Sequence, residues 1–143
     1  PKDPLSQRAL FQIASGYHQL AYYSRAAENY EKFAVQFPGE KDAPTALGNA
    51  YTFRVGMQEY EKAIENMNNF VKFYGAKKPQ DAANVFFQMG EVYEKEGRTE
   101  ELAKHLTAYL KTWGDKGGVD KQIVAHFKLG EILWKKSCPK EGV

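Results

Sequence analysis

Three histidines and one cysteine are the residues best suited to acid–base or metal chemistry in this chain of 143 residues. His18, His105, His126 and Cys138 stand far apart, and none lies three or four residues from another, so no two of them form a metal-binding pair on one helix face. Glutamates are plentiful, but their pattern is typical of exposed helix surface and indicates no perturbed acid–base pair. We therefore expect no enzyme, no catalytic residue, no bound metal and no cofactor.

A glycine-rich segment from Gly114 to Gly118 is the other feature that could bind a ligand. Its sequence GDKGG contains a lysine but lacks the spacing of a phosphate-binding loop, so a turn between two helices is the better interpretation. An all-α hydrolase or transferase would need a buried polar cluster, which the sequence does not reveal. An enclosed pocket with converging carboxylates and a histidine would revive that alternative.

Composition argues against nucleic acid and membrane partners. The 20 Lys and Arg residues against 18 Asp and Glu leave a net charge of +2, which implies no basic face for a polyanion. No apolar run approaches the ~18 residues of a membrane span, and no signal segment opens the chain. Because the sequence begins at Pro1 without Met, we expect a cut or processed product. Cys138 is either an inert thiol or the mate of a cysteine beyond Val143.

An apolar stripe at offsets 0, 4, 7 and 11 occurs three times and determines the expected organisation. Its copies are Ala26-Tyr30-Phe33-Phe37, Ala63-Met67-Phe70-Tyr74 and Leu102-Leu106-Tyr109-Trp113, each with a glycine close behind. A second stripe, with offsets 0, 3, 4 and 7 and a small third member, alternates with the first, as in Leu10-Ile13-Ala14-Tyr17 and Phe86-Met89-Gly90-Tyr93. Such regular recurrence is the signature of a repeat protein.

The two stripes predict two types of helix separated by short turns. The helices with the small third member, called A helices, are expected at 4–21, 43–56, 80–96 and 119–137. The others, called B helices, are expected at 24–37, 59–74 and 99–113. Asp3 and Pro4 suit a helix entry, and Pro44 and Pro79 suit the first turn of a helix.

The second hairpin differs from the other two in spacing. Ile13 to Ala26 and Met89 to Leu102 are each 13 residues apart, whereas Leu47 to Ala63 is 16. We therefore predict about one extra helical turn near residues 54–59.

Residues 7–114 and the helix after them resemble tetratricopeptide repeats. The matching residues include Ile13-Ala14 with Tyr17, Leu47-Gly48 with Tyr51, and Met89-Gly90 with Tyr93. The resemblance implies one all-α domain over 1–143, a right-handed α-α superhelix or solenoid. Its parts are three helical hairpins at about 7–40, 41–76 and 79–116, followed by a half-repeat or capping helix at about 119–137.

The ends of the B helices, YEKFAVQFPG and NNFVKFYG, are similar to repeats of bacterial envelope proteins such as the Tol-Pal coordinator and outer-membrane assembly lipoproteins. That resemblance implies a periplasmic or cell-envelope setting rather than the cytoplasm.

The resemblance also implies that a partner protein or peptide docks in a concave groove lined by the A helices. Residue-by-residue matching assigns the groove to Phe11, Ser15, His18, Asn49, Thr52, Phe53, Phe87, Glu91, Glu94, Phe127, Glu131 and Trp134. The anchors would be Phe11, Phe53, Phe87 and Trp134, with Asn49 and Glu91 as polar selectors. The specialised clamp for a C-terminal carboxylate is disfavoured, because Phe11, Thr45 and Phe87 stand where lysines are expected.

Each assignment has a plainer alternative. Phe87 and Phe127 could simply widen the apolar stripe, and Trp134 could be exposed only because no repeat follows it. Glu91, Glu94 and Glu131 could form a solvated face rather than an acidic patch. A different function class is an architectural spacer or oligomerisation segment of a longer multi-repeat protein, with self-association through the terminal helix.

Overall fold

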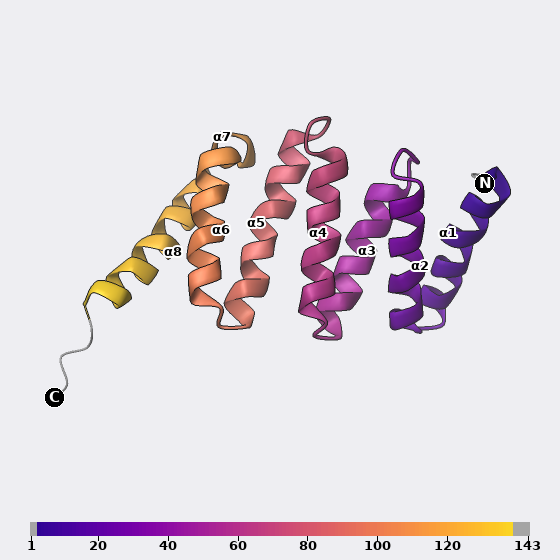
Figure 1. Cartoon of the computed structure of the whole chain (residues 1–143), viewed down its shortest axis with the longest axis horizontal. Coiled ribbons are helices and arrows are strands. Elements are labelled where there is room, and N and C mark those ends of the chain that lie inside the picture. The colour runs from indigo at the N-terminus through magenta and orange to yellow at the C-terminus, as the bar shows by residue number, and fades with distance from the viewer. Residues whose placement is uncertain (1–2, 139–143) are drawn as a thin grey trace. The chain divides into compact units, whose positions relative to one another are not determined.

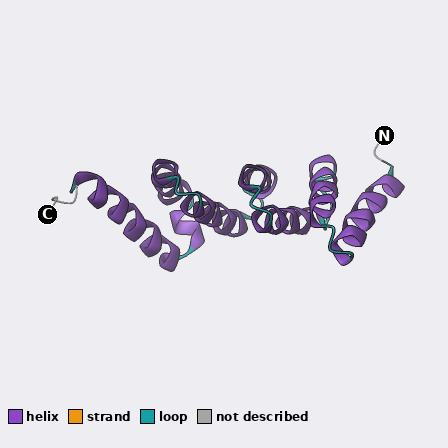
Figure 2. Ribbon diagram, turned by 90° about the horizontal axis from the view of Figure 1, so that it is seen from below, coloured by secondary structure: helices purple, strands orange, loops and turns teal. Residues whose placement is uncertain are grey.

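The structure is a computed structural model that describes residues 3–138. This part of the chain forms eight α-helices and no strand, which confirms the predicted all-α class (Figure 2). The helices are α1 (Pro4–Gln19), α2 (Tyr23–Gln36), α3 (Ala43–Gly56), α4 (Tyr60–Tyr74), α5 (Pro79–Lys95), α6 (Thr99–Thr112), α7 (Gly114–Gly117) and α8 (Val119–Ser137).

Contacts within the chain separate it into two compact units, Pro1–Tyr74 and Gly75–Val143. The first unit contains α1 to α4, and consecutive helices pack against each other in the order of the sequence (Figure 1). The second contains α5 to α8, in which α6 packs between α5 and α8. Sequential packing of this kind is what the helical repeats predicted. The single domain and the superhelical sense of the whole chain stay predictions.

The predicted helix entries and ends are close to those in the structure, because they depend on local signals. Asp3 caps α1 by accepting a hydrogen bond from the Leu5 backbone N–H at 3.1 Å, and Pro4 occupies the first turn. Pro44 and Pro79 likewise lie in the first turns of α3 and α5. All seven long helices begin and end within two residues of their predicted bounds.

The link from Gly114 to Gly118 is more ordered than the expected turn. Its first four residues form the short helix α7, in which the Trp113 carbonyl accepts hydrogen bonds from the N–H groups of Lys116 and Gly117. Gly118 ends it with a φ of 97°, a conformation that favours glycine. The segment thus links two helices, as predicted, and its single-turn helix α7 packs against α5 and α8.

All three A-to-B hairpins use the same turn. Ala21, Gln58 and Gly97 are left-handed, with φ values of 59°, 60° and 67°. The N–H of the next residue then bonds to the carbonyl five residues earlier: Tyr22 to Tyr17, Glu59 to Arg54, and Arg98 to Tyr93, at 2.8–2.9 Å. This is the hydrogen-bond pattern of a Schellman helix end.

The shared turn shows that the predicted extra turn near residues 54–59 was wrong. Each B helix starts at the same distance from its left-handed residue, and α3 is no longer than α1 or α5. The apparent insertion arose because Leu47-Gly48 was matched to Ile13-Ala14. By its place before the turn, Leu47 instead corresponds to Leu10. Arg54 therefore takes the position that Tyr17 and Tyr93 occupy in the other hairpins.

The B-helix stripes supply the cores of the two units. In the first unit Ala26, Tyr30, Phe33 and Phe37 are all buried, and Ala63, Met67 and Tyr74 are buried likewise. In the second unit Leu102, Leu106 and Tyr109 are buried, with Trp113 packed against them. The stripes are packing surfaces, as their spacing predicted.

Candidate functional site

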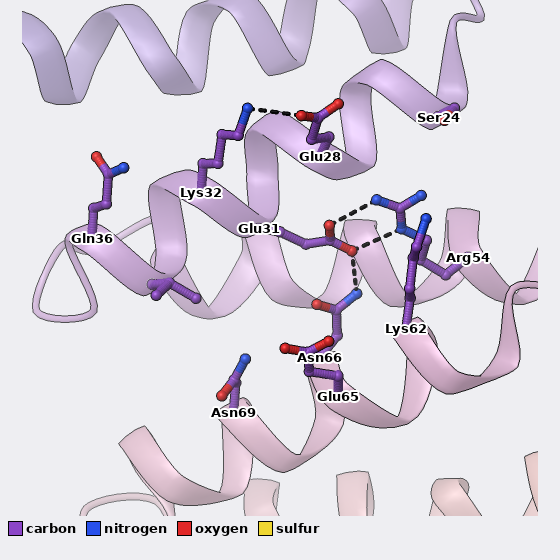
Figure 3. A pocket seen from close by; sticks show the side chains of 11 residues that line it. Ser24, Glu28, Glu31, Lys32, Gln36, Arg54, Lys62, Glu65, Asn66 and Asn69 are labelled. Carbon is purple, nitrogen blue, oxygen red and sulfur yellow. Dashed lines mark hydrogen bonds and ion pairs between the residues drawn. The ribbon is translucent and has the colours of Figure 1, made fainter.

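A hollow of about 520 Å³ opens between α2 and α4 of the first unit, above the end of α3 (Figure 3). It is lined by Ser24, Glu28, Glu31, Lys32, Val35, Gln36, Arg54, Lys62, Glu65, Asn66 and Asn69. None of these is a histidine or a cysteine, so this hollow is not the carboxylate-and-histidine pocket that an all-α enzyme would need.

The floor of the hollow is a polar network centred on Arg54, which is only 3% exposed. Its Nε and Nη2 atoms each donate to one oxygen of the Glu31 carboxylate at 2.8 Å (Figure 3). Its Nη1 donates to Glu59. The Asn66 side chain donates to Glu31 at 2.8 Å. Hydrogen bonds to these carboxylates, that of Glu31 foremost, raise the pKa of Arg54 above its ordinary value. The network joins α2, α3 and α4, so its first effect is to hold the first two hairpins together.

Charges at the rim of the hollow are exposed and largely paired. Lys32 and Glu28 lie 2.7 Å apart on one face of α2, and both side chains are more than half exposed. The hydrogen bond from Lys32 lowers the pKa of Glu28. Lys62 lies 3.4 Å from Glu59 at the other side. Acidic and basic side chains are mixed around the rim, and the polar groups of the floor are hydrogen-bonded to one another. The hollow therefore has no excess of positive or negative charge that would attract a ligand.

The sequence patterns do not point to the floor residues, because they predict contact positions only on the groove side of the A helices. Glu31 and Asn66 belong to B helices, and Arg54 was placed in a supposed insertion. A sequence signal did exist: Arg54 stands five residues before Glu59, just as Tyr17 and Tyr93 stand five residues before the residue that follows their turns.

The predicted groove residues of the first unit have different surroundings. Phe11 packs inward against the rings of Tyr30 and Phe33, at 5.6 and 5.2 Å between centroids. His18 is exposed, and its ring lies 4.7 Å from that of Phe53, so the structure brings these two residues of α1 and α3 together.

The polar candidates of the first unit do not meet at one site. Ser15 and Asn49 are half-buried, whereas Thr52 is exposed and donates its hydroxyl to the Gly48 carbonyl of its own helix at 3.0 Å.

In the second unit the predicted groove residues also divide between core and surface. Phe87 packs against Tyr109 with ring centroids 5.2 Å apart, and thus faces the core. Glu91 is exposed, while Glu94 accepts from Lys128 at 2.5 Å. Glu94 and Glu131 line a small hollow together with Lys128 and Lys135. Lysines therefore interrupt the acidic patch that these glutamates could have formed.

The remaining candidates, Phe127, Glu131 and Trp134, do lie together on α8. With His126, Gly130 and Lys135 they line a shallow hollow of about 360 Å³. Phe127 is 66% exposed and Trp134 is 69% exposed. These are high values for large aromatic side chains, which normally contribute to a core or an interface.

Two sides of α8 are apolar, and residues of the described range cover only one of them. Ala125 is buried, and Leu129 and Ile132 pack with it against the core of the second unit. We call the side of the helix around Gly130 the outer face of α8; its exposed apolar residues are Val119, Ile123, Phe127, Leu133 and Trp134. A surface helix normally carries polar residues on this side, so the outer face is the part of the second unit best suited to contact another molecule.

Neither a metal centre nor a membrane span is indicated in the described part of the chain. Within residues 3–138 no three His, Cys, Asp or Glu side chains converge in a way that could hold a metal ion. In that same range, no helix combines the length and apolar character needed to cross a bilayer. The exposed Cys138 is a free thiol there.

The fold and site thus define an all-α protein of stacked helical hairpins with an uncovered apolar helix face. No family model matches the chain. The chain is similar to the general transcriptional corepressor trfA of Dictyostelium discoideum, with 27% identity over 113 residues. This match covers 76% of the chain but only 7% of trfA.

Proposed function

We propose that this chain is a non-enzymatic scaffold for protein–protein interaction, and that its hairpins are degenerate tetratricopeptide repeats. The repeat assignment is supported by the identical turns at Ala21, Gln58 and Gly97. It is also supported by the ring pairs Phe11–Phe33 and Phe87–Tyr109, which join the A and B helices of the first and third hairpins with the same 5.2 Å separation.

The observation that carries the proposed function is the exposure of Phe127 and Trp134 on either side of Gly130. Large aromatic side chains provide much of the binding energy at protein interfaces when a partner covers them. In this structure they belong to a helix whose other side, at Ala125 and its neighbours, packs against the core of the second unit. A partner could therefore bind without ordering a loop, which lowers the entropic cost of association.

The relative supports the same general class. A corepressor is named for an action on transcription, and trfA shares with this chain a segment that is a small part of its own length. We take from it only that protein partners are to be sought. A bacterial envelope setting gains no support from this similarity.

The experiment is a binding array of amphipathic-helix and extended peptides, probed with the wild-type chain and with Phe127→Ala plus Trp134→Ala. Leu5→Ala is the matched control, because Leu5 is an exposed apolar residue of α1. We expect the double variant to lose most binding while the control keeps it. Equal binding by all three proteins, each with an unchanged circular dichroism spectrum, would remove the outer face from the proposed function.

The second candidate function is an architectural spacer or oligomerisation segment, favoured by the same apolar face if a further copy covers it. Sedimentation equilibrium over a dilution series separates the two candidates. A mass that rises with concentration, and that Phe127→Ala returns to the monomer, would favour self-association. A constant monomer mass would favour a scaffold for other proteins.

A further inference from the structure

The outer face of α8 corresponds to a face that is covered elsewhere in the same unit. Matching Leu129-Gly130 of α8 to Met89-Gly90 of α5 places Phe127 on Phe87 and Leu133 on Tyr93. The α5 positions form the interface with α6, whereas their α8 counterparts are exposed. The second unit therefore contains one complete hairpin interface and one helix with the same kind of face and no described partner.

The contacts of α6 show how closely a helix can pack on this face. A Cβ atom placed on Gly90 would lie 3.5–3.9 Å from the side chains of Leu102, His105 and Leu106. His105 stacks on Phe86 with ring centroids 4.2 Å apart, and its Nε2 bonds to the Phe86 carbonyl. These are ordinary van der Waals distances, so α6 packs directly against the small residue at position 90.

The corresponding position on α8, Gly130, has open space beside it. A Cβ atom on Gly130 would meet nothing within 4 Å, and Gly130 lines the shallow hollow between Phe127 and Trp134. A neighbouring helix could thus approach α8 as closely as α6 approaches α5.

We propose that the outer face of α8 binds an amphipathic helix of a partner protein, running antiparallel to α8 and packing as α6 packs on α5. This inference rests on the proposed function and names the class of partner. The bound helix would carry the stripe shared by α2, α4 and α6, which is a small or leucine residue followed at offsets 4, 7 and 11 by large apolar residues, the last two aromatic. Its residue at offset 7 would pack on Phe127, as Tyr109 packs on Phe87.

Charge adds a second requirement. The C-terminal end of α8 carries Lys135 and Lys136, and Lys136 already lies 3.6 Å from Glu100 in the first turn of α6. Lys135 forms no ion pair with any residue in the described range, and it borders the hollow beside Glu131. An antiparallel partner helix would place its N-terminal turn near Lys135. We therefore expect acidic residues in that turn, where they also suit the helix dipole.

The test uses the α6 sequence itself as probe, in the form of a synthetic peptide of residues 97–113 with Trp113→Phe. The protein is the whole chain with the same substitution, so that Trp134 is its only tryptophan. We expect a saturable blue shift of Trp134 emission and a gain of peptide helicity. A peptide that also carries Leu106→Ser and Tyr109→Ser serves as the matched control and should cause neither change.

Variants of the protein then locate the contact. Phe127→Ala should lower the affinity for the peptide roughly tenfold or more, as expected for a central aromatic anchor. Leu5→Ala should leave that affinity unchanged. Lys135→Glu should lower the affinity for the peptide several-fold, and a peptide with Glu100→Lys and Glu101→Lys should restore binding to that variant.

Three results would overturn the inference. One is an unchanged Trp134 emission at saturating peptide. Another is binding that Phe127→Ala leaves intact, because the peptide would then have replaced α6 in its own hairpin. The third is self-association that Phe127 controls, because a second copy would then be the occupant. A different outcome is that Phe127→Ala plus Trp134→Ala abolishes binding in the peptide array while the α6 peptide does not bind the wild-type chain. The partner would then not bind as an amphipathic helix, so this inference would be wrong while the proposed function would stand.

Discussion

The guanidinium of Arg54 on α3 and the carboxylate of Glu31 on α2 form a two-fold hydrogen-bonded ion pair, with both N–O distances at 2.8 Å. The Arg54 side chain is 4% exposed and that of Glu31 is 22% exposed. Arg54 stands where the other hairpins have a tyrosine, and its charged contacts extend to the preceding hairpin. This pair connects the first hairpin to the second.

Arg54→Met should destabilise the first unit by about 2 kcal/mol, because Glu31 would keep its charge with only Asn66 as a neutral donor. Hydrogen exchange of the amides in α2, α3 and α4 measures this effect directly. Lys32→Met is the matched control, since it breaks an exposed pair with Glu28 and should have little effect on stability. Equal effects of the two variants would show that burial of the Arg54 pair contributes nothing.

The left-handed turn residues make a second prediction. Gly97→Ala should cost about 1 kcal/mol, because its φ of 67° is strained for alanine. Ala21→Gly and Gln58→Gly should be neutral or stabilising by up to about 1 kcal/mol, since both residues already occupy this conformation. Thermal unfolding of the three variants is the measurement. A loss of stability in both glycine variants would contradict the argument.

Tyr109 and Gly117 make a third prediction. The Tyr109 hydroxyl is buried and has no hydrogen-bond partner among residues 3–138, and a Cβ on Gly117 would lie 1.9 Å from its oxygen. Gly117→Ala should therefore destabilise the second unit by about 2 kcal/mol or more. Tyr109→Phe should be neutral or stabilising, and it should remove part of the cost of Gly117→Ala. Urea unfolding followed by tryptophan fluorescence suits this double-mutant cycle, because both tryptophans belong to the second unit. Strict additivity would show that the two residues do not interact.

His105 predicts how stability depends on pH. Burial lowers the pKa of His105, against the opposing effect of its hydrogen bond to the Phe86 carbonyl. The unfolded chain therefore binds this proton more readily than the folded one. The contribution of neutral His105 to stability is fully present above the ordinary histidine pKa of about 6.5. It is lost as the pH falls toward the lower pKa that His105 has in the folded protein.

The measurement for His105 is urea unfolding of the second unit between pH 8 and 5.5. The slope below pH 6.5 should be at most about 1.4 kcal/mol per pH unit, and it should be smaller in His105→Gln, which does not titrate. A wild-type protein that becomes more stable on acidification over this range would contradict the expected sign.

The last prediction compares Phe87 and Phe127, which occupy equivalent helix positions although Phe87 packs against the core and Phe127 is exposed. Phe87→Ala should destabilise the second unit by about 3 kcal/mol, because the ring packs against Tyr109 in the core. Phe127→Ala should change the free energy of unfolding by less than about 0.5 kcal/mol, because two-thirds of the side chain is exposed. Comparable losses would show that Phe127 supports the fold and is not a free contact residue.

The sequence by itself determined the all-α class, the seven long helices and the two kinds of apolar stripe. These features depend on local periodicity, capping residues such as Asp3, and helix-breaking glycines and prolines, so they can be read within a few turns of chain. Burial of Tyr30, Phe33 and Tyr109 follows from the same spacing.

The tertiary structure alone decided how the stripes are matched and which faces stay uncovered. It placed Arg54 at the end of its hairpin against Glu31, 23 residues earlier in the chain, which the local match of Leu47-Gly48 had obscured. It also turned Phe11 and Phe87 toward B helices while leaving their counterpart Phe127 exposed. A stripe records that a face is apolar, but only the packing of distant segments determines whether another helix covers it.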